Sequence, residues 1–333
     1  MYLRVFESVI AFSVATALSL PAQSQEKADE RTTIAIPRTS DGHPDLQGIW
    51  TNATVTPLER PAQFAGRLTV TNEEAAKYEK QNNDNLYGDR RSENPERDRD
   101  HAYNSLFFDR GTELARVDGV KRTSLIVDPP DGKIPPLMPE AKKRNDARLL
   151  AIEQRFDRSQ DRPLGERCLL GFGSTSGPPM LPVLYNNYQI VQTADTIMIL
   201  VEMVHDVRSI HMDGRPHLQA NVRQWMGDSI GHWEGDTLVV DTTNFTDKTR
   251  FRGSGESLHV VERFTRLDLG TILYKVSIDD PTTYTKSWTL EYPFLATRGP
   301  IYEYACHEGN YAMPDILGGA RLAEKIEGAN SKK

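Results

Sequence analysis

The sequence predicts a mainly β protein, an antiparallel meander closed or curved into a barrel over residues 183–310, with an irregular, partly helical N-terminal half. Two observations predict this fold. From residue 183 onwards, about nine short β-rich runs follow one another, with turns about every 8–12 residues. No helical pattern interrupts these runs, so successive strands are expected to pair as hairpins. Closure into a barrel then removes the exposed strand edges.

Short turns such as Ala194-Asp195, Glu234-Gly235-Asp236 and Asp268-Leu269-Gly270 separate the expected strands. The predicted strands are Tyr188–Thr193, Thr196–Val204, Val222–Trp225, Ile230–Trp233, Thr237–Thr242, Val260–Thr265, Thr271–Ile278, Thr285–Tyr292 and Tyr302–Ala305.

The segment 57–182 is charged and broken by prolines, and we expect it to clasp the barrel. One helix is predicted from Glu73 to about Gln81, with Thr71 or Asn72 as its cap. A second is predicted over Pro139–Phe156, because proline suits the first turn of a helix. Between them, Leu125–Val127 resembles a strand that enters a tight turn.

Composition excludes several classes of protein. The chain has 333 residues, of which 38% are hydrophobic and 26% charged, and its net charge is 40 − 47 = −7. It is too apolar to be wholly disordered, and it is too acidic for a general nucleic-acid binder. No apolar run after the first 25 residues is long enough to span a membrane. We therefore expect a small-molecule substrate or ligand as its partner, with no nucleic acid and no membrane span.

Residues 1–24 resemble a secretory signal peptide, with Arg4 before a short apolar stretch and small residues for cleavage after Ala22 or Ser24. The mature protein is therefore expected to be periplasmic or secreted. Residues 25–56 form a polar tether followed by a segment that anchors Trp50 on the main body, and residues 311–333 form a C-terminal tail.

The chain contains two cysteines, Cys168 and Cys306. In an exported protein such a pair most often forms a disulfide, which here would close a long loop. The alternative is that Cys306, beside His307, is a nucleophile or a metal ligand. A bridge would bring residues 165–167 beside the aromatic and polar cluster Tyr302–Tyr311. Such a cluster suits the rim of a small-molecule pocket, although tyrosines on a late strand are also ordinary core residues.

The stretch Glu202–His217 carries the densest group of ionisable residues. On one continuous strand, alternation places His205 on the face of Ile197 and Ile199, and places Glu202, Asp206 and Arg208 on the other face. Charged groups on otherwise apolar strands need partners. They predict either an acid–base site in the barrel lumen, with His205 as base, or structural ion pairs of Glu202 and Asp206 with Arg208. His232 and His307 are the next catalytic candidates.

The histidines also allow a metal site, because imidazoles that leave one coordination position open suit catalytic zinc. Its ligands would be His205, His211, His217 and His232, although spacings of six residues match no recognised ligand motif. We therefore expect no cofactor, and a divalent metal is the alternative.

These features predict an exported lyase, isomerase or hydrolase that acts by acid–base chemistry on a small polar or aromatic molecule. Glu202 or Asp206 would orient His205, and Arg208 would hold an anionic oxygen. The alternatives are a binding protein that carries a small hydrophobic ligand in its lumen, and a histidine-ligated metalloenzyme.

Three segments, 41–50 (DGHPDLQGIW), 227–245 (GDSIGHWEGDTLVVDTTNF) and 302–311 (YEYACHEGNY), resemble those of a large family of uncharacterised exported bacterial proteins. The resemblance covers roughly residues 40–320. It implies a periplasmic or secreted protein and carries no reaction or catalytic residue over to this chain. A looser likeness to lipocalin-type barrels rests on the series of hairpins alone.

Overall fold

The computed structural model describes residues 35–87, 109–171, 177–249 and 251–330. The segment from Ala35 to Lys333 forms one compact unit. The predicted signal peptide lies outside the described residues.

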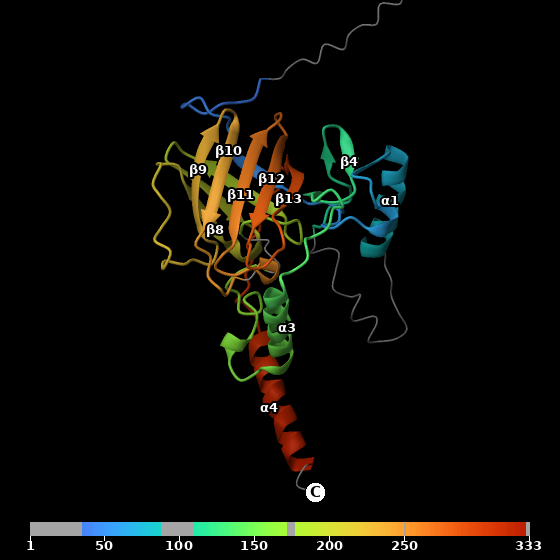
Figure 1. The fold of residues 1–333 in the computed structure, drawn as a ribbon, viewed down its shortest axis with the longest axis vertical. Helices are drawn as coiled ribbons and strands as arrows, with labels where there is room; N and C mark the ends of the chain where they lie inside the picture. Colours follow the sequence, from blue (N-terminus) through green and yellow to red (C-terminus); the bar gives the residue numbers. More distant parts are fainter. Residues whose placement is uncertain (1–34, 88–108, 172–176, 250, 331–333) are drawn as a thin grey trace, which may run out of the picture. The chain divides into compact units, whose positions relative to one another are not determined.

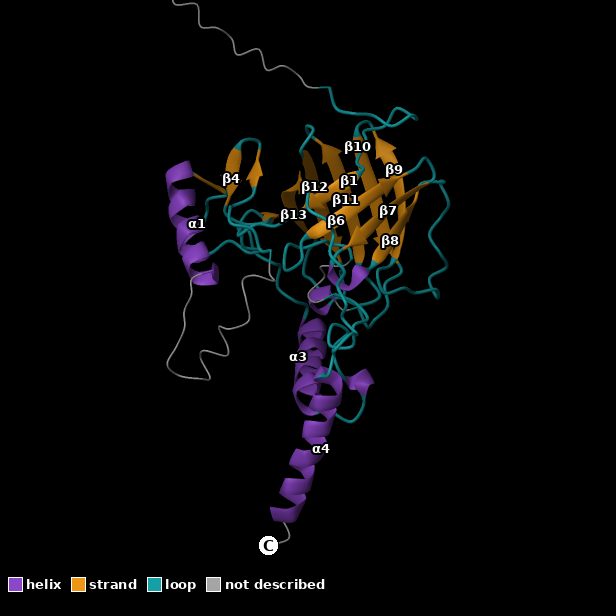
Figure 2. Cartoon of the chain, turned by 180° about the vertical axis from the view of Figure 1, so that it is seen from behind, coloured by secondary structure: helices purple, strands orange, loops and turns teal. Residues whose placement is uncertain are grey.

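Nine strands close into a barrel, which confirms the predicted fold class (Figures 1 and 2). The barrel closes because β1 pairs antiparallel with both β6 and β13. The segment predicted to anchor Trp50 is therefore one of the strands. The strands are β1 (Gly48–Thr51), β6 (Asn187–Gln192), β7 (Thr196–Val201), β8 (Val207–His211), β9 (Asp228–Glu234), β10 (Thr237–Thr243), β11 (His259–Arg266), β12 (Thr271–Asp279) and β13 (Trp288–Ala296).

Two predicted strands are not strands in the structure. Tyr302–Ala305 is irregular, and β13 offers it no free edge, because that strand already pairs with β12, β1 and the short β5 (Ile126–Asp128). Val222–Trp225 lies in the connection from β8 to β9 instead. These two strands pair in parallel, so the connection 212–227 must return along the outside of the barrel.

The predicted strand Thr196–Val204 also ends early. β7 stops at Val201, and a single turn of 3-10 helix follows at Met203–His205, where Val204 and His205 have φ values of 62° and 48°. Because of this turn, the alternation of inward and outward side chains on β8 is shifted by one residue relative to that on β7. Arg208 therefore points into the barrel together with Ile210, while Val207 and Ser209 face outward.

Aromatic side chains fill the barrel interior. On β11 and β12 every second residue is buried, as expected for strands with one face toward a core. The rings of Tyr188, Phe264, Tyr274, Tyr292 and Phe294 pack against one another with centroids 5.0–6.4 Å apart. Each fully buried ring of this size contributes on the order of 2–3 kcal/mol of hydrophobic stabilisation.

The segment before β6 contributes a small sheet and two helices. Strands β2 (Thr69–Val70), β4 (Val120–Arg122) and β3 (Arg116–Val117) form the sheet, and α1 (Asn72–Tyr87) follows β2. The predicted cap of α1 is confirmed, because the Thr71 hydroxyl accepts a hydrogen bond from the Glu74 amide and the Glu74 carboxylate accepts one from the Thr71 amide.

The helices α3 (Pro139–Gln154) and α4 (Ala312–Asn330) complete the set labelled in Figure 1. The helix α3 begins at proline as predicted and ends two residues earlier than expected. The segment predicted to be a tail instead contains a helix, α4. In the described part of the chain, no helix combines the length and apolarity that crossing a membrane requires.

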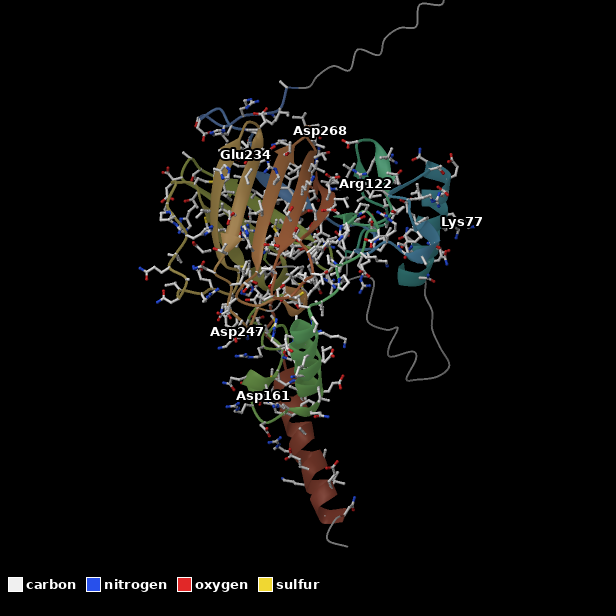
Figure 3. The ribbon with its side chains drawn as sticks, in the orientation of Figure 1. Lys77, Arg122, Asp161, Glu234, Asp247 and Asp268 are labelled. Atoms are coloured by element: carbon white, nitrogen blue, oxygen red, sulfur yellow. A yellow bond between two sulfur atoms is a disulfide. The ribbon has the colours of Figure 1, made fainter. Side chains whose placement is uncertain are left out.

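The two ends of the barrel differ in their connections. Tight turns close one end, where Glu234 and Asp268 lie, whereas Asp247 lies at the opposite end (Figure 3). The long connections from β5 to β6, from β10 to β11 and from β12 to β13 are at this second end. We call it the loop end. Every cavity described below lies there.

Candidate functional site

A disulfide joins Cys168 to Cys306, with an S–S distance of 2.01 Å and a Cα–Cα distance of 5.7 Å. This confirms the predicted pairing and rules out a free Cys306 thiol as nucleophile or ligand in this structure. The bridge holds residues 163–171 against the segment 299–311 that follows β13. Gly165 and Glu166 consequently lie beside the tyrosine-rich segment, as the sequence predicted.

A cavity of about 1110 Å³ lies where these two segments meet the ends of β6 and β7. We call it the tyrosine pocket. Four tyrosines and four carboxylates line it, and its described walls contain no lysine, arginine or histidine side chain. The lining groups with these functions are Tyr185, Tyr302, Tyr304, Tyr311, Asp109, Glu166, Glu202 and Glu303.

Glu202 is the most informative residue of the tyrosine pocket. It follows β7 and is only 4% exposed. Its carboxylate accepts hydrogen bonds from Asn187 Nδ2 at 2.8 Å and from the amide of Tyr302 at 3.0 Å. Both donors are neutral, and within the described residues no cationic side chain lies within 4.0 Å. A buried carboxylate without a counter-ion is costly, because hydrogen bonds restore only part of the lost hydration.

The tyrosines give the pocket an aromatic wall. Tyr185 and Tyr304 meet edge to face, with centroids 5.1 Å apart. Tyr302 and Tyr311 are 71% and 73% exposed, so their rings remain available to a bound molecule. Aromatic faces carry partial negative charge, which adds to the field of the carboxylates.

The predicted acid–base group does not gather in one place. His205 is exposed, and its Nδ1 lies 3.1 Å from the carbonyl oxygen of Tyr304, so it touches the segment that forms the tyrosine pocket without lining the pocket. Asp206 is half-buried between His205 and β8. Of these four candidates, Glu202 alone lines a described cavity.

Arg208 instead belongs to the barrel interior, where it is 3% exposed. Its guanidinium forms a two-pronged ion pair with Glu262, with one contact at 3.0 Å, and donates to Ser229 Oγ at 3.1 Å. The hydroxyl of Tyr274 donates to the same carboxylate at 2.8 Å. Burial raises the pKa of Tyr274 well above its usual range, so this hydroxyl remains a donor. The expected pairing of Arg208 with Glu202 or Asp206 is thus replaced by one with Glu262.

The other two catalytic candidates lie apart from Glu202. His232 is exposed on β9, with Nε2 3.3 Å from Glu234 Oε1. His307 lines a separate cavity of about 270 Å³ together with Arg167 and Asn310.

The four histidines considered as metal ligands are also not brought together. Among the described residues, no group of three or more histidine, cysteine or acidic side chains has the arrangement of a metal site. His217 instead lies between two carboxylates, with Nδ1 3.1 Å from Asp228 and Nε2 2.9 Å from Asp241. Asp241 also contacts His259 at 2.9 Å. His259 and Asp241 were not candidates in the sequence, where their spacing gives no signal.

This histidine–carboxylate chain fastens the connection 212–227 to the outside of the barrel. Burial opposes ionisation of Asp228, but hydrogen bonds from Arg215, the Leu218 amide and His217 outweigh it and lower the pKa to about 2. The hydrogen bond to Asp241, opposed in part by burial, raises the pKa of His259 above its ordinary value of 6.5. Asn244 adds three hydrogen bonds from its side-chain amide to carbonyl groups of the same connection.

No protein-family model, no curated protein and no solved structure matches this chain. We therefore infer function from the geometry of its cavities.

Proposed function

We propose that this chain is an exported protein that binds a small organic cation in the tyrosine pocket. One observation carries the proposal: the buried carboxylate of Glu202 lies at the wall of a cavity and has no cationic partner among the described residues. A bound cation would supply the missing counter-ion and offset the cost of burying this charge.

The rest of the pocket supports the same class of ligand. Its described walls present four tyrosine rings and three further carboxylates, without a positively charged side chain. Cations bind over aromatic faces at distances up to about 6 Å from the ring centroid, with the strongest attraction in desolvated sites. Glu166 is paired with Arg162, so Glu202, Glu303 and Asp109 dominate the field in the pocket.

Export is supported by the disulfide and by the predicted signal peptide. The two cysteines of the chain pair with each other. Such bonds persist in oxidising compartments and are rare in the cytosol. We infer that the protein works in the periplasm or outside the cell.

Acid–base turnover of the bound molecule is a second candidate, favoured by the same residue. A buried carboxylate in the wall of a pocket that four tyrosines also line provides a proton acceptor, and the tyrosine hydroxyls provide donors, for a lyase, isomerase or hydrolase. In this account Glu202 is the acid–base group, and His205 supports the position of the Tyr304 backbone. Loss of turnover in Glu202→Gln, with binding of a neutral substrate analogue retained, would distinguish catalysis from simple binding.

The binding proposal is tested by calorimetric titration with choline and with its uncharged isostere, 3,3-dimethylbutan-1-ol. We expect choline to bind about tenfold more tightly or better, because the two probes differ chiefly in charge. Glu202→Gln should weaken choline binding by a similar factor and leave the affinity for the alcohol unchanged. The control is Glu308→Gln, an exposed carboxylate on the same segment that does not line the pocket.

Equal affinity for the two probes would contradict the proposal. So would choline binding that survives Glu202→Gln, or binding that Glu308→Gln weakens equally. Circular dichroism of each variant confirms that the fold is retained, since glutamine can still accept from the Tyr302 amide.

A further inference from the structure

A second cavity at the loop end, of about 940 Å³, has the opposite charge. It lies between α3, the segment 160–171 and the loops that contain Trp225 and Phe251. Asp161, which lines it, and Asp247, beside the lining residue Lys248, lie on this side of the barrel (Figure 3). We call it the arginine pocket.

Cationic side chains predominate around the arginine pocket. Asp161 is the one carboxylate among its described lining residues. The cations are Arg148, Arg155, Arg162, Arg167, Lys248 and Arg252. In a chain with a net charge of −7, such a concentration needs an explanation.

Three of these cations have no close partner among the residues that the structure describes. Arg162 is paired with Glu166. The side chains of Arg155, Arg167 and Arg252, however, form no hydrogen bond or ion pair with any residue that the structure describes. Several arginines elsewhere in the described chain are paired with carboxylates, as Arg122 is with Glu291, and others, such as Arg60, bond to backbone and hydroxyl oxygens. A single solvated arginine is ordinary, but three around one cavity indicate a site for negative charge.

The floor of the pocket is apolar. Phe245 and Phe251 are buried beneath it, and Tyr284 and Leu137 also line it. Trp225 is 37% exposed at its wall, so part of its ring is open to a bound molecule. Pockets that combine apolar walls with a few convergent charges bind small amphipathic molecules.

We propose that the arginine pocket binds an organic anion. Its carboxylate, sulfonate or phosphate group would lie against Arg155, Arg167 and Arg252, and its apolar body would pack on Trp225 and Phe251. This inference is independent of the tyrosine pocket, since the two cavities share only Gly165 among their described lining residues.

Two fluorescent probes that differ by one charge test the inference. 8-Anilinonaphthalene-1-sulfonate carries a sulfonate, and N-phenyl-1-naphthylamine is its neutral counterpart. We expect the sulfonate probe to bind at one site, and the double variant Arg167→Gln/Arg252→Gln to weaken it about tenfold or more. The neutral probe should be unaffected. Arg298→Gln is the matched control, because Arg298 is exposed and does not line the cavity.

Location is tested by energy transfer from tryptophan to the bound probe, which Trp225→Phe should reduce. Inorganic phosphate should compete with the sulfonate probe at high concentration, because both need the same guanidinium groups. Glu202→Gln should leave binding of the sulfonate probe unchanged, because Glu202 does not line the arginine pocket. Failure of the cation-binding proposal can therefore be told apart from failure of the anion-binding proposal. The inference is overturned if the double variant binds the sulfonate probe like the wild type, if Arg298→Gln weakens it equally, or if the probe does not bind.

Discussion

At the scale of single residues, the barrel interior contains one ion pair among aromatic rings. Arg208 and Glu262 are 3% and 0% exposed, and Ser229 and Tyr274 complete their hydrogen bonds. Two charges in such an interior gain little net stability together, but either one alone is strongly unfavourable. The pair therefore fixes how β8 faces β11, because any other register would leave a charge uncompensated.

This arrangement predicts a non-additive pair of mutations. Arg208→Met and Glu262→Leu should each lower the free energy of unfolding by about 3–5 kcal/mol, because each leaves the other charge buried without a counter-ion. The double variant Arg208→Met/Glu262→Leu should lose less free energy of unfolding than either single variant. Urea unfolding of the four proteins measures the effect, and losses that simply add would show that the two residues do not act as a pair.

The signal for Glu262 was present in the sequence. It lies between Val260 and Phe264 on a strand whose alternate residues are apolar, so it is a charge directed into the core. Arg208 was predicted to line an active site because its partner lies 54 positions away and gives no local signal. The alternation of apolar residues along a strand identifies a charge that points into the core. The residue that pairs with this charge can be identified only when the order of the strands in the barrel is known.

At the scale of elements, the hairpins were predictable because their turns and their strands lie in one short window. β9 with β10 and β11 with β12 match the predicted strands to within a few residues. The turn at Met203–His205 was not predictable from alternation, since two non-glycine residues there adopt positive φ. The parallel pairing of β8 with β9 was missed for a different reason, because it depends on contacts made only in the folded barrel.

The connection 212–227, which joins the parallel strands β8 and β9, should make the free energy of unfolding depend on pH. Because the pKa of His259 is raised in the folded state, its stabilising contact with Asp241 is complete below pH 6.5 and is lost as the pH rises through the raised value. The stabilising contribution of Asp228 depends on pH in the opposite direction. It is present above pH 3.8 and is lost as the pH falls toward about 2.

We therefore expect the free energy of unfolding to decline as the pH rises above 6.5, and His259→Gln to flatten this decline. His307→Gln, which removes an exposed histidine elsewhere, serves as the control. Urea unfolding between about pH 5.5 and pH 8.5 provides the measurement. Parallel pH profiles for the wild type and His259→Gln would show that this contact does not stabilise the fold.

At the scale of the whole molecule, long connections, cavities and the disulfide share one end of the barrel. The opposite end has only tight turns among its described hairpins. The sequence predicted the barrel, the disulfide and the proximity of residues 165–167 to the tyrosines. It did not place Glu202 beside Tyr302, because these residues are 100 positions apart and meet only after the barrel has closed.

The disulfide should stabilise both the fold and the tyrosine pocket. Its loop spans 138 positions, and constraint of an unfolded loop of that length is worth about 4–5 kcal/mol. Cys168→Ser/Cys306→Ser should lower the free energy of unfolding by up to this amount and weaken choline binding. A reducing agent should reproduce both effects in the wild type and have no effect on the double variant. Unchanged stability after reduction would contradict this role.

The most direct test of the account is where an organic cation binds. Crystals grown with (4-bromobenzyl)trimethylammonium would locate the probe through the anomalous scattering of its bromine. The account predicts a peak in the tyrosine pocket, with the ammonium group within about 6 Å of a tyrosine ring and facing the Glu202 carboxylate. A probe bound elsewhere, or bound in this pocket with its ammonium group turned away from Glu202, would contradict the account.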